Sequence, residues 1–333
     1  MRQLSPKRKM IVAVVVCTMI SFNMWVLHYA SSTHDLEPPS GRWFETQYLR
    51  LEEREPAREG LLLLEGYSNP RLTLRMWCTV ESAVRAHPHL PVSLLMTASV
   101  IKENALLHNM TSQFSNLHVL HLNLSQLFHG SLLEAWYTQN KWKDSYWPQS
   151  HLNDGIRWML LWKYGGIYLD LDAIVVRSLA HLPNCTARES DNYVAAGALK
   201  FSQGHPVICA CLHHLAHYFS GTVWGANGPE LLTQVLIDRC GLELPSDRVP
   251  GCPDVTVLPP RAFYPLPWWE WRRYMQEDPA LAYDLLNDAQ VYSLHMWNLH
   301  TRHKPVLLTS NQIYALAAHA LCPTTVAHAG LTM

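Results

Sequence analysis

The most informative segment of this chain spans residues 152–172 and reads LNDGIRWMLLWKYGGIYLDLD. Apolar residues recur at helical spacing between Ile156 and Tyr164, which predicts a helix with one apolar face. Asn153 or Asp154 suits the start of that helix, and the glycine pair that begins at Gly165 suits its end. The segment therefore predicts a helix, a tight glycine stop and a strand.

The strand expected after the glycines carries two aspartates at its far end. Because side chains alternate across a strand, Tyr168, Asp170 and Asp172 are predicted on one face and Leu171 on the other. Neighbouring carboxylates repel each other unless a cation joins them, and hard divalent cations prefer oxygen ligands. The carboxyl edge of a parallel sheet is also where ligands bind in open α/β folds. The pattern predicts a divalent cation site that holds a diphosphate.

Length and charge limit the possible classes of protein. The chain has 333 residues and a formal net charge of −1, which suits one large domain and gives no sign of a nucleic-acid partner. Strands are expected at residues 61–64, 92–96 and 117–122, and a helix at 75–86. Strands that alternate with helices predict an α/β domain with a mostly parallel sheet.

The N-terminal part has the pattern of a membrane anchor. Four basic residues stand within residues 1–9, and residues 10–29 form an apolar run without Asp, Glu, Lys or Arg. Twenty residues suffice to cross a bilayer, and the basic flank places the N-terminus in the cytosol. We expect a cytosolic tail (1–9), a transmembrane signal-anchor (10–29), a stem (30–58) and a lumenal catalytic domain (59–333). A cleaved signal peptide, cut near residues 30–32, is the alternative.

A lumenal domain is open to glycosylation and disulfide formation. Asn109, Asn123 and Asn184 stand in glycosylation acceptor triplets. Seven cysteines lie beyond the apolar run, so some are expected to pair and at least one is left over. Cys240 and Cys252 are close in sequence and form a candidate bridge; the sequence does not pair the others.

Residues 152–172 also resemble the core of the α-1,4-glycosyltransferase family. The similarity extends in order from about residue 61 to 326 and includes Cys78-Thr79-Val80-Glu81, Asn227-Gly228-Pro229, Leu258-Pro259-Pro260-Arg261, Trp268, Trp271, His295-Met296-Trp297-Asn298 and Cys322-Pro323-Thr324-Thr325. This resemblance implies a GT-A-like fold, a place in the Golgi membrane, a UDP-sugar donor, Mn²⁺ and retention of the anomeric configuration.

The resemblance also implies roles for individual residues. It implies catalytic roles for Asp154, Arg157, Asp170 and Asp172, metal ligation by Asp170, Asp172 and His295, donor contacts from Glu65, Tyr168, Asp154 and Arg157, and acceptor contacts from Asn227, Gly228, Trp268 and Trp269. A packed core histidine is the other interpretation of His295, and a buried aromatic cluster is the other interpretation of the tryptophans.

The function that the resemblance implies is transfer of galactose, or of GalNAc or GlcNAc, from a UDP-sugar in α-1,4 linkage to the terminal sugar of a glycosphingolipid. A binding or chaperone-like protein that kept the fold without turnover is the main alternative. A haloacid-dehalogenase-type phosphatase is a third, but Ile174 stands where that class has threonine. Front-face return and double displacement both stay open as mechanisms.

Overall fold

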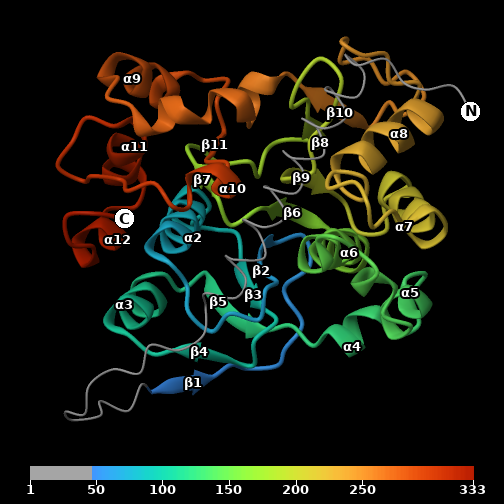
Figure 1. Ribbon diagram of the computed structural model, residues 1–333, viewed down its shortest axis with the longest axis horizontal. Helices are drawn as coiled ribbons and strands as arrows, with labels where there is room; N and C mark the ends of the chain where they lie inside the picture. Colours follow the sequence, from blue (N-terminus) through green and yellow to red (C-terminus); the bar gives the residue numbers. More distant parts are fainter. Residues whose placement is uncertain (1–46) are drawn as a thin grey trace, which may run out of the picture. The chain divides into compact units, whose positions relative to one another are not determined.

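A seven-stranded sheet forms the centre of the computed structural model, which describes residues 47–333 (Figure 1). Its strands, in spatial order, are β10 (Val255–Leu258), β8 (Asn184–Ala187), β9 (Ala198–Phe201), β6 (Gly166–Leu169), β2 (Leu61–Glu65), β3 (Val92–Met96) and β5 (Leu117–His121). The pairs from β6 to β5 are parallel, as is β10 with β8, and only β9 runs antiparallel to its neighbours. The predicted α/β class with a mostly parallel sheet is confirmed.

Two small sheets and the helices complete the described fold. The strands of the small sheets are β1 (Tyr48–Arg50) with β4 (Val100–Lys102), and β7 (Ala173–Val175) with β11 (Ser293–His295). The helices are α2 (Leu74–Ala86), α3 (Ala105–Gln113), α4 (Leu124–Phe128), α5 (Glu134–Thr138), α6 (Pro148–Tyr164), α7 (Pro206–Tyr218), α8 (Pro229–Cys240), α9 (Pro279–Asn287), α10 (Asn298–Thr301), α11 (Ile313–Leu321) and α12 (Pro323–His328), with 3-10 turns η1 (Lys141–Lys143), η2 (Pro260–Ala262) and η3 (Trp268–Met275).

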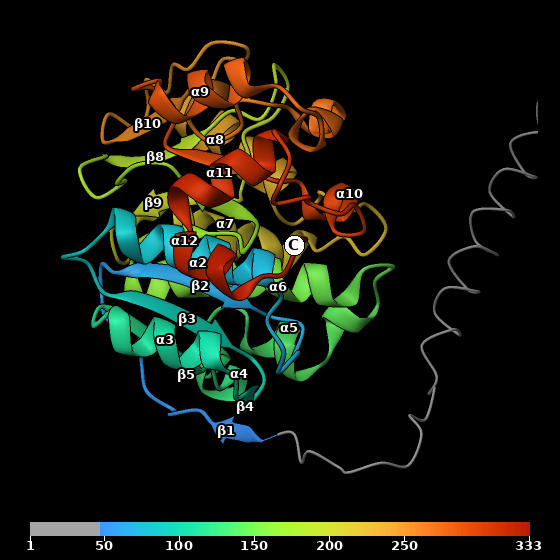
Figure 2. The same cartoon turned by 90° about the vertical axis from the view of Figure 1, so that its left-hand side faces the viewer.

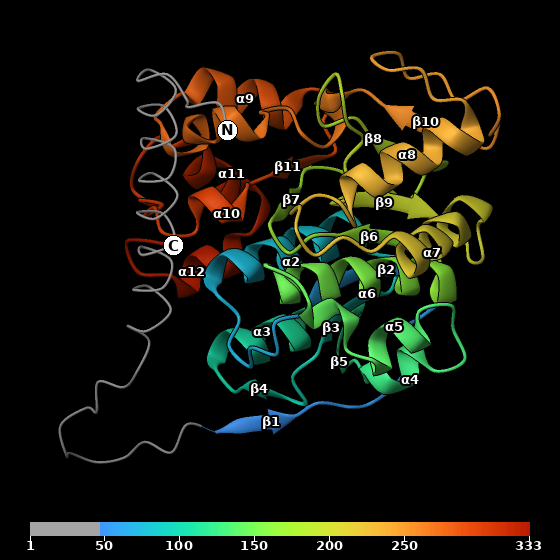
Figure 3. The same cartoon turned by 45° about the vertical axis from the view of Figure 1, so that its right-hand side comes forward.

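Helices cover both faces of the sheet, which explains the continuous apolar run of β2. Leu61 and Leu63 pack in a core with α2 and α3, whereas Leu62 and Leu64 pack in a core with α6, α7 and α8. Figure 3 shows α6, α7 and α8 gathered on one side of the sheet. A strand buried on both faces needs no polar alternation, so four leucines in a row are stable there.

The expected element boundaries agree with the structure except around the candidate site. The strands at 61–64, 92–96 and 117–122 and the helix at 75–86 are confirmed within one residue. The predicted helix start at Asn153 or Asp154 is wrong, because α6 begins at Pro148, a residue well suited to a first helical turn. The predicted extension of the strand through Asp172 is also wrong. Strand β6 ends at Leu169, and a turn closed by the Ala173 N–H on the Asp170 carbonyl follows it.

The N-terminal side of the described chain is packed on the domain. Residues 47–58 were expected in the stem, but β1 pairs with β4 and Leu51 is buried, so this part belongs to the same compact unit. The predicted anchor, residues 10–29, lies outside the described residues. Within residues 47–333, no helix is both long enough and apolar enough to cross a bilayer.

The predicted glycosylation sites stay predictions. Asn109 is exposed on α3, Asn123 caps α4, and Asn184 begins β8.

Two disulfides join distant and neighbouring parts of the domain. The expected Cys240–Cys252 bridge is confirmed, and a second bridge links Cys78 on α2 to Cys322 before α12. Beside the second bridge, the buried Glu81 carboxylate accepts hydrogen bonds from the backbone N–H groups of Thr324 and Thr325. The C-terminal helix is therefore fixed to the first long helix of the domain.

Removing the long bridge is expected to cost more stability than removing the short one. The bridges span 244 and 12 residues, and the chain-entropy model gives the longer loop about 2–3 kcal/mol more stabilisation. Denaturant unfolding without reductant should therefore show a larger loss of unfolding free energy for Cys78→Ser/Cys322→Ser than for Cys240→Ser/Cys252→Ser. Equal losses would contradict this expectation.

Candidate functional site

The tight turn between α6 and β6 aligns the polar residues of both elements. Gly165 and Gly166 have φ values of 68° and 91°, and a Cβ on Gly166 would lie 2.1 Å from the Gly60 carbonyl oxygen. The chain therefore reverses at once. From Asp154 to the end of α6 the helix advances about 15 Å, close to the roughly 13 Å from Gly166 to Asp170 along the strand. Asp154 therefore lies level with Asp170.

Arg157 joins the carboxylates of the helix and the strand. Its guanidinium donates from Nη1 to Asp154 Oδ1 at 2.7 Å and from Nη2 to Asp170 Oδ1 at 3.0 Å. It also lies over the ring of Tyr168, whose hydroxyl donates to the same Asp170 oxygen at 3.0 Å. One oxygen of Asp170 is thus fully engaged by the protein, which fixes the direction of the other.

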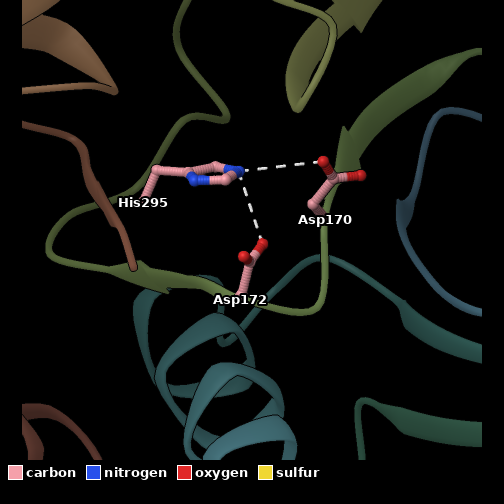
Figure 4. Close-up of side chains that lie close together, drawn as sticks. All are labelled: Asp170, Asp172 and His295. Carbon is pink, nitrogen blue, oxygen red and sulfur yellow. Dashed lines mark ion pairs between the residues drawn. The ribbon is translucent and has the colours of Figure 1, made fainter. Parts of the chain in front are cut away.

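The second aspartate is held in the same way by a different element. Asp172 Oδ2 accepts from the backbone N–H of Asn298 at 2.7 Å, at the start of α10. Its other oxygen, Oδ1, lies 3.3 Å from His295 Nε2, and Asp170 Oδ2 lies 3.7 Å from the same nitrogen. Figure 4 shows the imidazole of His295 facing both carboxylates. Each aspartate therefore directs its second oxygen toward His295 Nε2.

These residues fit a divalent cation. One ligand atom each from Asp170, Asp172 and His295 lies within 4.8 Å of the others, and two carboxylates with one imidazole suit a cation of this class. Strand β6 ends at Leu169, before either aspartate, so the predicted alternation of side chains along a strand does not bring Asp170 and Asp172 together. The turn after β6 and the pairing of β11 with β7 bring the three residues together instead.

The charges of the cluster depend on one another. Burial disfavours ionised Asp170, but Arg157 and His295 hold its pKa below the usual value. Burial also opposes charge on His295, yet Asp172 and Asp170 hold its pKa above the usual value. Burial raises the pKa of Asp154 to about 7, because Arg157 only partly offsets the loss of water. Asp170 is therefore held ionised, whereas the raised pKa of Asp154 favours its protonated form near neutral pH.

Gly197 forms one wall of the candidate metal cluster, which consists of Asp170, Asp172 and His295. Its carbonyl accepts from the Asp170 N–H at 2.8 Å, and a Cβ at this position would lie 2.8 Å from Asp170 Oδ2 and 3.1 Å from His295 Nε2. Any side chain here would enter the space where the three ligand atoms converge.

Gly197→Ala is expected to weaken Mn²⁺ binding about 10–100-fold, because the new methyl group must displace a ligand side chain. Mn²⁺ titration followed by electron paramagnetic resonance measures this affinity. Gly330→Ala is the matched control, since a Cβ at Gly330 meets nothing within 4 Å. An unchanged affinity in Gly197→Ala would argue against cation binding at the convergence of Asp170, Asp172 and His295.

Gly228 and Glu65, which were also expected in the site, contact different parts of the protein. Gly228 packs against Asp154, where a Cβ would be 2.8 Å from Oδ1. Glu65 is buried and accepts from the N–H groups of Tyr67 and Asn69, so its carboxylate holds the loop after β2, and burial raises its pKa.

The residues expected to contact an acceptor differ in exposure. The side-chain amide of Asn227 is buried. Its oxygen accepts from the Ser220 N–H, and its nitrogen donates to the Ser220 carbonyl. Trp268 and Trp269 are exposed on η3, and the ring of Trp268 stacks with that of His300 on α10. These tryptophans do not form a buried cluster.

Sequence reasoning missed two residues that shape the site. Gly197 contributes no side chain, so no pattern marks it. Asn298 belongs to a segment that resembles the family, but its contribution is a backbone N–H, and its buried side-chain Oδ1 has no partner in the described chain. Arg157 Nε is likewise buried and has no hydrogen-bond partner within the described chain.

The chain is similar in sequence to known glycosyltransferases. Residues 74–190 match a glycosyltransferase sugar-binding region that contains a DXD motif, and residues 200–329 match an alpha 1,4-glycosyltransferase conserved region. The chain is 36% identical to rat (Rattus norvegicus) lactosylceramide 4-alpha-galactosyltransferase over 289 residues, 84% of this chain and 78% of that protein. It is 30% identical to human (Homo sapiens) alpha-1,4-N-acetylglucosaminyltransferase over 282 residues, 80% of each. A crystal structure of the galactosyltransferase LgtC with donor and acceptor sugar analogues aligns at 14% identity and TM-score 0.40, over 80% of this chain and 95% of that one.

Proposed function

The chain belongs to the α-1,4-glycosyltransferase family and is a hexosyltransferase, and from this premise we propose that it moves galactose from UDP-galactose to a lactosylceramide-like glycosphingolipid. The new bond is α-1,4 to the terminal sugar, and the donor's anomeric configuration is retained. The observation that carries the proposal is the convergence of Asp170, Asp172 and His295 beside Arg157. A GT-A-like arrangement of the catalytic domain is part of the same proposal.

The proposed cofactor is Mn²⁺, held by Asp170, Asp172 and His295. Bound there, it would supply positive charge to the diphosphate as the bond to the anomeric carbon breaks. Arg157 keeps Asp170 oriented, and the N–H of Asn298 keeps Asp172 oriented, so neither carboxylate must reorganise during the reaction. For Asp154, which accepts from Arg157, the proposed role is to contact hydroxyls of the donor sugar.

A non-catalytic binding protein is the alternative that the experiment must separate. Purified protein is incubated with Mn²⁺, one of UDP-Gal, UDP-GalNAc or UDP-GlcNAc, and lactosylceramide or another glycosyl-lipid, and the product linkage is determined by NMR. The proposal predicts α-1,4-galactosyl product with UDP-Gal. Donor binding without product in all combinations would favour the binding protein.

Removal of divalent metal is expected to abolish transfer reversibly. Treatment with EDTA followed by desalting should leave no detectable product, and added Mn²⁺ should restore the rate, because the carboxylates alone cannot neutralise the leaving diphosphate. Full activity in the chelator would contradict the metal role.

The proposed location is the Golgi membrane, with residues 1–9 in the cytosol, residues 10–29 across the bilayer and the catalytic domain in the lumen. Glycosylation at Asn109, Asn123 or Asn184 would report that the domain entered the lumen. Sensitivity of the expressed full chain to an N-glycosidase measures this, and a chain without glycans that is digested by protease added to intact vesicles would contradict the topology.

A further inference from the structure

Exposed aromatic side chains surround the metal cluster. We define the site rim as residues 67–72, 138–147, 219–228, 268–275 and 297–305. The structure describes eleven tryptophans, and all four that are exposed lie in this rim: Trp147, Trp224, Trp268 and Trp269. Tyr67, Tyr146, Val223 and Leu299 extend the same exposed apolar set. A soluble monomer seldom gathers its exposed tryptophans in one place, so this concentration indicates an interaction surface.

Hydrogen bonds and ring contacts join the rim segments into two arms. In one arm, the Tyr146 N–H donates to the Gly221 carbonyl at 2.9 Å, and the Tyr67 hydroxyl lies 3.3 Å from Ser150 Oγ at the start of α6. In the other arm, the ring of His300 stacks with those of Trp268 and Trp271.

Both arms converge on the metal cluster. Gly228 of the first arm packs on Asp154, and Asn298 of the second holds Asp172. In Figure 2, α10, the start of α6 and the yellow segment after α7 lie on the same, right-hand side of the domain. Both arms therefore include residues that contact the candidate site, and these segments lie on one side of the domain.

The rim is also strongly basic. It contains seven lysines and arginines, namely Arg71, Lys141, Lys143, Arg272, Arg273, Arg302 and Lys304, against two acidic residues, Asp144 and Glu270. The whole chain has 26 basic and 27 acidic residues, so positive charge is concentrated at the rim. Tryptophan and tyrosine, with Lys and Arg beside them, are the residues that settle at a bilayer interface, where the ring enters the headgroup layer and the cation meets lipid phosphate.

We propose that the site rim docks on the bilayer surface, so that the catalytic site opens directly onto the glycolipid headgroups of that membrane. This inference rests on the proposed function in one respect: a glycosphingolipid acceptor holds its sugars within the headgroup layer, and only a site whose mouth touches the membrane can reach them. The two arms of the rim are then the points of contact with the bilayer.

The first test detects lipid contact independently of catalysis. The full chain is reconstituted in phosphatidylcholine vesicles, with or without phosphatidylserine, with a photoreactive benzoylphenylalanine at position 224 or, in the control, at position 283. Trp224 lies in the rim and is 49% exposed, whereas Tyr283 on α9 lies outside the rim and is 71% exposed. Irradiation should attach labelled lipid at position 224 and not at 283, and phosphatidylserine should raise the yield. Attachment to a second protein chain instead of lipid would overturn the proposal.

The second test compares a bilayer acceptor with a soluble one. Tyr146→Ser/Trp224→Ser/Leu299→Ser removes three exposed rim side chains, and Tyr283→Ser/Ile237→Ser/Leu132→Ser removes three exposed side chains elsewhere. The rim variant should raise the KM for vesicle-embedded acceptor about tenfold, as expected for partial loss of apolar insertion. Its kcat/KM for a water-soluble lactoside should be unchanged.

The outcomes separate this surface from the proposed function. Equal loss on both acceptors, or no loss on either, would overturn membrane docking. If wild-type protein transfers to neither acceptor yet still labels lipid through position 224, the proposed function fails while the docking surface stands.

Discussion

Asp172→Ala is expected to lower the kcat of sugar transfer about a thousandfold while the protein still folds. Asp172 provides one converging oxygen, and its other oxygen only accepts from the Asn298 N–H. Its loss leaves two of the three ligand atoms, and the departing diphosphate loses most of its charge compensation. Initial rates with saturating donor, with and without excess Mn²⁺, measure the effect.

Two comparisons make the Asp172 result interpretable. Asp238→Ala removes an exposed aspartate of α8 that accepts only from Gln234 in the same helix, so its kcat should stay at the wild-type value. A circular dichroism spectrum and glycosylation state like wild type would show that Asp172→Ala is folded. If folded Asp172→Ala protein keeps its activity, Asp172 has no part in the mechanism.

Arg157→Met is expected to reduce the free energy of unfolding by about 3–5 kcal/mol and to abolish transfer. The Arg157 guanidinium is nearly buried and is the cation between Asp154 and Asp170. Its removal leaves the buried Asp154 carboxylate and the half-buried Asp170 carboxylate without their shared partner, and Asp170 loses a donor that orients it. Denaturant unfolding and transfer rates measure the two effects separately.

Arg188→Met provides the matched control for Arg157. Arg188 also bridges two aspartates, Asp191 and Asp247, but both face solvent, so the expected loss is at most about 1 kcal/mol. The double variant Arg157→Met/Asp154→Asn should recover part of the lost stability without recovering transfer. A small stability change in Arg157→Met would mean that the carboxylates do not need this guanidinium.

The sequence predicted those elements of the fold that are determined by their own residues. Four leucines from Leu61 predicted a strand, and the glycines after Tyr164 predicted an abrupt helix end. The start of α6 escaped prediction because Asn153 looks like a cap, while Pro148, five residues earlier, begins the helix. A residue suited to a helix cap does not by itself show whether the helix extends further toward the N-terminus.

Long-range contacts set the limit on predicting the site. His295 entered the metal set only through family resemblance, because its position depends on the pairing of β11 with β7. The Cys78–Cys322 bridge spans most of the domain, and nothing local to either cysteine marks its partner. Gly197 leaves space for Asp170 and His295 because it has no side chain, and only the folded structure shows that these residues are its neighbours.

The late position of β11 in the chain has a consequence for biosynthesis. Both aspartates of the metal cluster emerge from the ribosome long before His295, and the strand that carries His295 must then pair with β7. A nascent chain that stops short of β11 lacks one of the three side chains that converge in this cluster. The cluster of Asp170, Asp172 and His295 can therefore form only after residue 295 has been translated and β11 has paired with β7.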